Sequence, residues 1–374
     1  MKILYLCTYY HRAMIFRDAM NALEKLGDQL LAFNAVVKGA AVSPKYASIM
    51  HQKVLHRECF SKYDRFLYPL KQYKFERAVL AATDITSFDL IHSHTLFNGG
   101  WAAYCIYKKH KIPYVVTVRN TDLNDYLKWP FSRYIARKII KKASGILFLS
   151  ISYRDSFFKK IYGKDLPKNL LAKTQVIPNG LEDFWHQNSG NPKASIHQPL
   201  RFLCVGKIDT NKNILCILQA MDILKQQGIE SSLTVIGQVV DQPVYEVLKD
   251  NRNVILVNYL TKEELLKYYR ESDIFIMPSI FESFGRVYAE AMSQGLPVIY
   301  SQGQGFDGLF PEGCVGYHVP AKDPAQMALV TKKILENYSA ISSKCIEKSA
   351  LFNWNDIAKK LQDFYKNVCS GERE

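Results

Sequence analysis

The 374 residues are too many for one ordinary hydrophobic core and predict two domains of about 150 to 200 residues each. A composition of 48% hydrophobic and 22% charged residues excludes an intrinsically disordered chain, and no apolar run reaches the roughly 20 residues that span a bilayer. The formal charge of +14 is concentrated in residues 1–198, which carry 30 lysines and arginines against 14 acidic residues, whereas residues 199–374 carry 19 against 21.

The first half of the chain alternates apolar segments with helical patterns. Its strand-like segments are residues 2–7, 90–92, 114–118, 145–149 and 174–177, and its helical patterns include residues 101–109 and 131–142. Strands that alternate with helices predict a parallel sheet wound by right-handed crossovers. The residues from Tyr9 to Arg12 interrupt the first apolar run, so we expect a buried strand there and not a signal peptide.

A break in this pattern follows the turn dipeptide Asn179-Gly180. The next residues, 187–199, are rich in Asn, Ser, Gly, Pro and His and show almost no periodicity, which is typical of an exposed linker. We therefore expect an N-terminal domain at residues 1–185 and a linker at residues 186–199.

The pattern then restarts and predicts a second domain at residues 200–353. Its strand-like segments are residues 200–206, 233–237, 254–257, 274–277 and 297–300, and its helical patterns are residues 214–227, 243–249, 261–270 and 284–294. Thr261, with Glu264 three residues later, has the signature of a capping box at a helix start. Two such units predict an α/β protein with two doubly wound domains that face a cleft, with ligands beyond the carboxyl ends of the strands.

Residues 279–298 carry the strongest local signal. A short loop brings Glu282 after a buried strand, and a helix is expected to begin near Phe284 and Gly285. The first amides of a helix have no partner within the helix and carry the positive end of its dipole, so they suit a diphosphate. Glu290 lies about a turn and a half further on, where its carboxylate could accept hydrogen bonds from the hydroxyls of a ribose. For either acid alone the favoured alternative is a helix cap or a solvated side chain, but the whole segment favours a binding site.

Glu282 and Glu290, with seven residues between them and Ala-Met-x-x-Gly-x-Pro-Val-Ile after them, resemble the E-x7-E signature of the retaining GT-B glycosyltransferases of family 4. Residues 205–213 resemble the cation-bearing loop of that family, residues 176–180 the segment that ends its N-terminal domain, and residues 88–94 its Asp-x-x-His-x-His strand end. The resemblance covers most of the chain. It implies the GT-B fold of two Rossmann-like domains, with a C-terminal helix in residues 354–374 that packs back on the N-terminal domain.

The resemblance also implies a role for each matching residue of the C-terminal domain. The implied donor-binding residues are Gly206, Lys207, Lys212, Phe284, Gly285 and Glu290. The two lysines would neutralise the pyrophosphate of a nucleotide diphosphate-sugar, the amides at the helix start would hold it too, and the second acid would bind the donor ribose. Glu282 would touch the donor sugar as a catalytic residue.

In the N-terminal domain, the resemblance implies that His94 faces the transferred sugar as a second catalytic residue. Arg119 and Asp122 belong to a segment that stands where many members carry His-Gly-x-Asp, and they would contact the acceptor. The sequence departs from the family pattern at other positions. Lys207 replaces the usual Arg, so a bidentate fork becomes a point charge, and Asn213 replaces the usual Gly. The first loop also lacks the common Gly-Gly pair.

Other chemistries find less support. The chain has no Asp-x-Asp triplet for a metal-bridged donor, no G-x-G-x-x-G after the first strand and no G-x-S-x-G elbow. Ser93 lies between two histidines but lacks a partner acid at a useful spacing for nucleophilic catalysis. The eight cysteines form no C-x-x-C pair, which indicates buried free thiols and not a disulfide framework or a metal site. We therefore expect no cofactor and no metal.

Two stretches of the first half combine basic and aromatic residues. One is residues 62–77, and the other carries Arg133, Arg137, Lys138, Lys141 and Lys142 on adjacent helical turns. Such stretches suit an anionic membrane surface, whereas the alternative is a solvated helix whose aromatic residues point inward. No nucleic-acid-binding motif accompanies the charge, so we expect no nucleic acid partner.

These observations predict a retaining, metal-independent hexosyltransferase in the cytoplasm, peripheral at the cytoplasmic membrane face. It would move a sugar from a nucleotide diphosphate-sugar to a saccharide or lipid-linked saccharide acceptor in surface polysaccharide or glycolipid synthesis. Three alternatives stay open: a nucleotide-sugar epimerase, a sugar phosphorylase of the same fold, and a catalytically inactive, membrane-associated partner protein.

Overall fold

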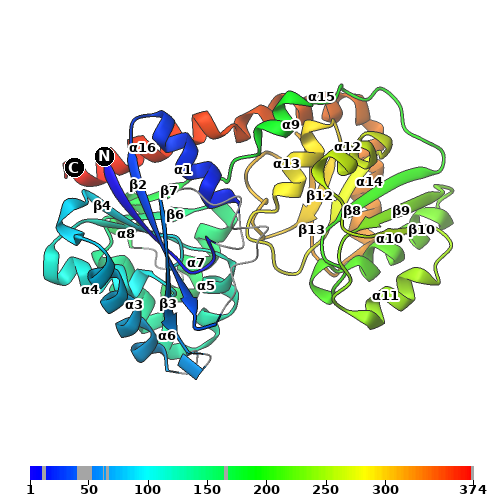
Figure 1. Cartoon of the computed structure of the whole chain (residues 1–374). Helices are drawn as coiled ribbons and strands as arrows, with labels where there is room; N and C mark the ends of the chain where they lie inside the picture. The colour runs from blue at the N-terminus through cyan, green and yellow to red at the C-terminus, as the bar shows by residue number, and fades with distance from the viewer. Residues whose placement is uncertain (11–13, 40–52, 62, 65–66, 164–166, 372–374) are drawn as a thin grey trace. The chain divides into compact units, whose positions relative to one another are not determined.

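The computed structural model describes residues 1–10, 14–39, 53–61, 63–64, 67–163 and 167–371. The chain forms two compact units (Figure 1). The first unit contains residues 1–149, 154–180 and 354–374, and the second contains residues 150–153 and 181–353. No helix of the described residues is long and apolar enough to cross a membrane.

The first unit is built on a sheet of seven parallel strands in the order β3-β2-β1-β4-β5-β6-β7. These strands are β1 (Lys2–Cys7), β2 (Gln29–Val37), β3 (Val54–Phe60), β4 (Leu90–Ser93), β5 (Tyr114–Thr117), β6 (Gly145–Phe148) and β7 (Thr174–Val176). All residues of β4, β5 and β6 are buried, which explains their continuous apolar sequences, since both faces of a parallel sheet are covered. The five predicted strands are confirmed, and β2 and β3 were not predicted.

Helices cover both faces of this sheet. They are α1 (Ile15–Lys25), α3 (Tyr68–Ala82), α4 (Gly100–His110), α5 (Asn120–Asn124), α6 (Pro130–Lys142), α7 (Ile151–Tyr162), α8 (Lys168–Ala172) and α16 (Trp354–Ser370). The last of these lies beside α1 in Figure 1, and its apolar face joins the same buried cluster as α1 and the strands below. Ile357, Phe364 and Tyr365 are among its buried residues, each worth about 1.5 to 3 kcal/mol when removed from water.

The second unit is built on six parallel strands in the order β10-β9-β8-β11-β12-β13. These strands are β8 (Leu200–Val205), β9 (Ser231–Ile236), β10 (Val254–Val257), β11 (Ile274–Met277), β12 (Val298–Ser301) and β13 (Gly316–Val319). Its helices are α9 (Asp183–Gln187), α10 (Ile214–Gln226), α11 (Gln242–Lys249), α12 (Lys262–Glu271), α13 (Arg286–Ser293), α14 (Pro324–Glu336) and α15 (Tyr338–Ser349). The capping box at Thr261 and Glu264 is confirmed, because each residue's side chain accepts the other's backbone amide, at 3.3 and 2.8 Å.

The segment predicted as an exposed linker is fastened to the second unit. The Nζ of Lys193 donates to the carbonyl oxygens of Arg270 and Ser272, at 2.6 and 2.5 Å, and so caps the end of α12. His197 lies with its Nδ1 2.8 Å from a carboxylate oxygen of the fully buried Asp273. Residues 187–199 are all at least partly exposed, and their polar side chains and amides hold the segment against α12 and next to the start of β11.

Candidate functional site

Two of the predicted residues meet beyond the carboxyl ends of β8 and β11. The Nζ of Lys212 lies 2.8 Å from Oε2 of Glu282, and each side chain is 15% exposed. The same ammonium lies 3.5 Å from Oγ of Ser279. An ammonium group has three N–H donors, so this partly buried ion pair leaves donor capacity for an added anion.

The loop that carries Lys212 is fixed by its own side chains. Thr210–Lys212 forms a single 3-10 turn, and Oδ1 of Asp209 accepts the backbone amide of Lys212 at 3.0 Å. Asn213 follows with φ = +56°, in the left-handed region that glycine favours and asparagine tolerates. This conformation explains how asparagine can stand where the family pattern has glycine without changing the path of the loop.

Gly206 and Lys207 lie at the other end of this loop and differ in their contacts. A Cβ added to Gly206 would lie 2.9 Å from Cε of Lys212, so the glycine makes room for that side chain. The side chain of Lys207 is exposed and forms no ion pair among the described residues. The structure therefore brings Lys212, but not Lys207, into contact with Glu282.

The helix predicted after Glu282 is α13, and it begins at Arg286. Gly285 caps it with φ = +74°, and a Cβ there would lie 2.5 Å from the ring of Tyr288, so this position requires glycine. Phe284 is 1% exposed and packs on Phe352 with ring centroids 5.6 Å apart. The Phe284 side chain is thus part of the core and cannot contact a ligand.

The Glu282 loop is held from its other side by the segment after β12. The amide of Glu282 donates to Oε1 of Gln304 at 3.0 Å, and the amide of Gly305 donates to the carbonyl oxygen of Glu282 at 2.8 Å. Sequence analysis did not find Gln304, because nothing in the local sequence marks a contact 22 residues away.

Glu290 lies inside the second unit, and only 8% of the residue is exposed. The hydroxyl of Tyr269 donates to its Oε2 at 3.0 Å, and burial raises the pKa of this carboxyl. A ribose at the predicted position would therefore have to share this carboxylate with Tyr269.

His94 directly follows β4 in the first unit, and aromatic rings surround its side chain. The ring centroids of Tyr5, His92 and Phe16 lie 4.3, 4.2 and 4.8 Å from that of His94. Both ring nitrogens of His94 are buried and lack a hydrogen-bond partner among the described residues. Burial, with the neighbouring His92 and the charge of Arg119, holds the pKa of His94 well below its ordinary value. The ring is thus neutral, with one donor and one acceptor unused.

Arg119 lies next to His94. Its Nε donates to the carbonyl oxygen of His94 at 2.8 Å, and its guanidinium lies over the ring of Phe16 at 5.1 Å. Arg119 and His94 line a small cavity of about 40 Å³, together with Asn179 and Thr117. This volume is enough for a few water molecules or one ligand group.

Asp122 is fully buried, which changes its predicted role. Its carboxylate accepts the backbone amides of Leu96, Phe97 and Arg119 at 3.0, 3.0 and 2.9 Å. Burial raises the pKa of this carboxyl to about 6 despite the three bonds. Direct contact with an acceptor would require these bonds to break, so the carboxylate ties the loop after β4 to the loop after β5.

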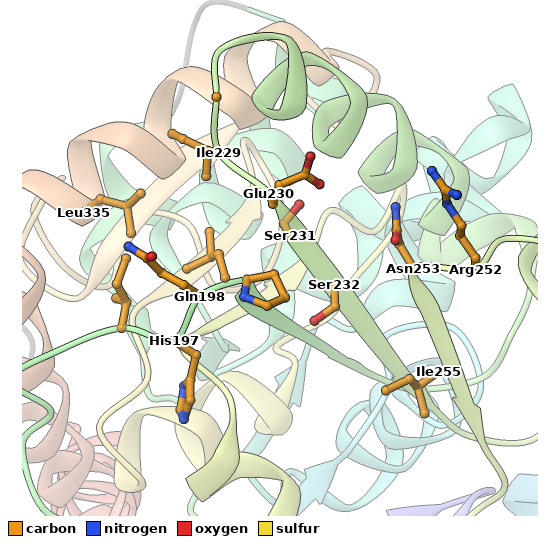
Figure 2. Close-up of a pocket in the computed structure, with 14 residues that line it drawn as sticks. His197, Gln198, Ile229, Glu230, Ser231, Ser232, Arg252, Asn253, Ile255 and Leu335 are labelled. Carbon is orange, nitrogen blue, oxygen red and sulfur yellow. The ribbon is translucent and has the colours of Figure 1, made fainter.

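A larger cavity of about 780 Å³ lies at the opposite end of the second sheet. Figure 2 shows its lining side chains, which come from the starts of β9 and β10 and from residues 196–200. The only full charges labelled there are Glu230 and Arg252, which are of opposite sign, beside His197. Ligands of parallel α/β sheets bind at the carboxyl ends of the strands, which is the end where Lys212 and Glu282 lie, whereas this cavity lies at the other end.

One further group of metal-ligand types occurs among the described residues. Asp307, Glu312 and His318 converge within 4.8 Å of one another. His318 Nδ1 lies 2.8 Å from Asp307 Oδ1 and 3.3 Å from Glu312 Oε1, and Tyr300 and Gly303 bond the two acids. Sequence analysis did not single out this group, and its members are fully engaged with one another.

The helix α6 presents its basic side outward together with large aromatic residues. Trp129, Phe131 and Tyr134 are 69%, 61% and 54% exposed, whereas Ile135 and Ile139 face the core. The alternative, a solvated helix whose aromatic residues point inward, therefore does not describe these three side chains. We call residues 128–142 the α6 surface.

The other basic stretch, residues 62–77, is less free. Lys62, Arg65 and Phe66 lie outside the described residues. Lys71 donates to Oδ1 of Asn98 at 2.7 Å, and Lys74 forms an ion pair with Asp64 at 2.8 Å. These internal contacts use up cationic groups that the prediction assigned to a surface.

Comparisons with known proteins identify the family and the fold of the chain. Residues 16–183 match the family model described as Glycosyltransferase Family 4, and residues 188–351 match the model described as Glycosyl transferases group 1. A glycogen synthase of Mycobacterium tuberculosis is 23% identical over 305 residues, covering 76% of this chain and 70% of the relative. An alpha-monoglucosyldiacylglycerol synthase of Streptococcus pneumoniae is 26% identical over 306 residues, covering 74% and 66%. The Anabaena protein HepE, solved in complex with UDP, has the same fold with a TM-score of 0.74 at 15% identity, covering 98% of this chain and 100% of that chain.

Proposed function

Because the chain belongs to family 4 of the glycosyltransferases, we propose that it moves a sugar, with retention of anomeric configuration, from a nucleotide diphosphate-sugar to a saccharide or lipid-linked saccharide acceptor. The product would enter a surface polysaccharide or a glycolipid. The named relatives include a glycogen synthase and a diacylglycerol glycosylating enzyme, which supports both acceptor types. In this proposal the second unit binds the donor and the first unit binds the acceptor.

The single observation that carries the proposal is the ion pair between Lys212 and Glu282, 2.8 Å long and only 15% exposed on each side. As the bond between sugar and phosphate breaks, negative charge grows on the leaving diphosphate. A held ammonium and the first amides of α13 can stabilise that charge without reorganising, which is the efficient form of electrostatic catalysis. Glu282 both positions the lysine and presents its carboxylate to the donor sugar.

This charge stabilisation is also the reason we propose a metal-independent reaction. A lysine ammonium and oriented amides supply the positive potential that a divalent cation supplies in other transferases. Lys207, exposed at the same loop, would add a second and more mobile positive charge. Activity that persists in excess EDTA supports this part of the proposal, and activity that needs added Mg²⁺ or Mn²⁺ contradicts it.

In the first unit, we assign His94 contact with the transferred sugar. Its two ring nitrogens are buried and have no hydrogen-bond partner in the described part of the chain, and an unsatisfied buried polar group costs free energy unless a ligand supplies the missing bonds. A sugar hydroxyl can both donate to and accept from a neutral imidazole. In this proposal Arg119, whose Nε bonds the carbonyl oxygen of His94, contacts the acceptor, and Asp122 acts through the loops that it ties together.

We further propose that the protein works at the cytoplasmic membrane face and binds anionic lipid through the α6 surface. Exposed Trp129, Phe131 and Tyr134 beside lysines and arginines match the amphipathic pattern of an interfacial helix. The positive charge would attract anionic headgroups while the aromatic rings enter the headgroup region. A soluble saccharide acceptor would need no such surface.

The proposed function is tested by a screen of nucleotide sugars with intact-mass detection of products and NMR of the anomeric carbon. We expect one donor to be consumed with an acceptor present and the product to keep the donor's anomeric configuration. Conversion of donor alone to its epimer, or a requirement for free phosphate, would identify the epimerase or phosphorylase instead. Absence of any nucleotide binding would leave the inactive partner protein.

A further inference from the structure

The C-terminal helix places one tyrosine in the core beneath His94. Tyr365 of α16 is 0% exposed, and its hydroxyl lies 2.7 Å from Nδ1 of His92 and 3.2 Å from the hydroxyl of Tyr5. On the other side of the same imidazole, Nε2 lies 2.7 Å from Oγ1 of Thr117. All four side chains are buried, so water cannot replace a bond that is lost.

These bonds fix the orientation of the His92 ring. Burial and the charge of Arg119 lower the pKa of His92 to about 3, so the ring is neutral at physiological pH. A neutral imidazole has one donor and one acceptor nitrogen, and here each has a hydroxyl at 2.7 Å. Rotation of the ring about its axis would therefore break both bonds at once.

His92 in turn supports His94. The two ring centroids lie 4.2 Å apart with their planes at 34°, and the Tyr5 ring meets His94 edge-on at 4.3 Å. His94 has no hydrogen-bond partner for its ring nitrogens among the described residues. Its orientation thus depends on the rings that it packs against and on the backbone bond between its carbonyl oxygen and Arg119.

We propose that Tyr365 is a positioning residue for His94: by fixing His92 between two hydroxyls, it holds the orientation of the His94 ring, which lines the adjoining cavity. This inference rests on the proposed role of His94 in sugar transfer. It gives α16 a function besides closing the core, because the helix carries the hydroxyl on which the orientation of His92 depends.

The test replaces the hydroxyl and nothing else. Tyr365→Phe should lower kcat by about 10-fold and change KM for the donor little, since the groups proposed to bind the diphosphate and the ribose lie in the second unit. Tyr114→Phe is the matched control, because Tyr114 is also 0% exposed and its hydroxyl donates to the carbonyl oxygen of Ile139 at 2.6 Å, outside the His92 chain. This control should keep the wild-type kcat.

A spectroscopic measurement separates positioning from loss of stability. In protein labelled with ¹⁵N-histidine, Tyr365→Phe should move the ring nitrogen signals of both His92 and His94, and Tyr114→Phe should move neither. Wild-type kcat in Tyr365→Phe overturns the inference, and so does a loss of turnover with His94 signals unchanged. If the wild-type enzyme transfers no sugar, the proposed function fails, and the spectra still decide the positioning.

A second variant keeps the test open if Tyr365→Phe folds poorly. Thr117→Val removes the bond on the other side of His92 and leaves α16 untouched. It should give the same signal changes and a similar loss of kcat. The double variant should be no worse than either single one, because both act through one ring, and two losses that simply multiply would contradict a shared chain.

Discussion

The candidate site residues of the two units differ in charge and burial. In the second unit, Lys212 and Glu282 are charged, 15% exposed and paired across 2.8 Å. In the first unit, His94 and His92 are neutral, buried and held by rings and hydroxyls. The contrast teaches that the basic charge of the N-terminal half does not lie at the residues proposed to act in sugar transfer there. The fixed charge that suits a diphosphate lies in the half that is nearly neutral overall.

The largest effect is expected from removing the ammonium group that pairs with Glu282, because this tests whether the charged site of the second unit acts in catalysis. Lys212→Ala should lower kcat/KM by about 2–4 kcal/mol of transition-state stabilisation, the cost of losing one preorganised charge contact. Lys207→Ala should cost less, because that side chain is exposed and forms no ion pair among the described residues. Lys225→Ala, an exposed lysine of α10, is the control for lost charge alone. Equal losses for Lys212 and Lys225 would refute the assignment.

The buried carboxyl of Asp122 in the first unit predicts that the free energy of unfolding depends on pH. The pKa of Asp122 is raised from 3.8 to about 6, so the folded state binds more protons than the unfolded state between these values. The contribution of this carboxyl to the free energy of unfolding is therefore full below about pH 4 and is lost as pH rises through about 6, by at most about 3 kcal/mol. Denaturant unfolding at pH 4, 5, 6 and 7 measures it, with Asp122→Asn as the reference that cannot titrate. A gap between the two proteins that stays constant with pH would contradict it.

Removing the neutral imidazole of His94 tests the contribution of the first unit to turnover. His94→Ala should lower kcat by about 100-fold, in the range of a lost contact to the reacting group, with little change in nucleotide affinity. The pH–rate profile of the wild-type enzyme should show no inflection from His94 near pH 6.5, because burial holds its pKa far lower. His110→Ala, at the exposed end of α4, is the matched control. A profile that inflects near pH 6.5 and loses the inflection in His94→Ala would show a titrating histidine.

The smallest expected effect concerns the α6 surface. Binding to vesicles should rise with the fraction of anionic lipid and weaken with salt. The double variant Trp129→Ala, Phe131→Ala should weaken it by about 1–2 kcal/mol, since each ring contributes interfacial burial. Tyr259→Ala, which removes a 68% exposed ring of the second unit, should have no effect. Co-sedimentation with vesicles across a salt series measures this binding. Binding that does not depend on salt or on lipid charge would contradict the proposal.

Sequence reasoning located the features that depend on local pattern. Continuous apolar segments gave the central strands of both sheets, and the Thr261 capping box gave a helix start to the residue. It missed the edge strands β3 and β13, whose sequences mix apolar with polar residues, and it also missed β2, although the sequence of β2 is largely apolar. It predicted an exposed linker at residues 187–199 but not the bonds that Lys193 and His197 form with the rest of the second unit, because polar composition does not reveal them.

Contacts between residues far apart in the sequence could not be predicted from local sequence patterns. The Lys212–Glu282 pair joins residues 70 apart, and the bond from Tyr365 to His92 spans 273 residues. The resemblance to family 4 placed both ends of the first pair in one site but did not predict that they pair with each other. It gave no hint of the second contact, since no local spacing encodes it.

The central claim is that the second unit binds a nucleoside diphosphate on Lys212 and the start of α13. It is tested most directly by titration calorimetry of the wild-type protein and Lys212→Ala with UDP, GDP, ADP, TDP and CDP at 0.15 M salt. We predict that at least one of these binds the wild-type protein and binds Lys212→Ala at least 10-fold more weakly, while Lys225→Ala is unchanged. No binding by any of the five, or equal binding by wild type and Lys212→Ala, would contradict the claim.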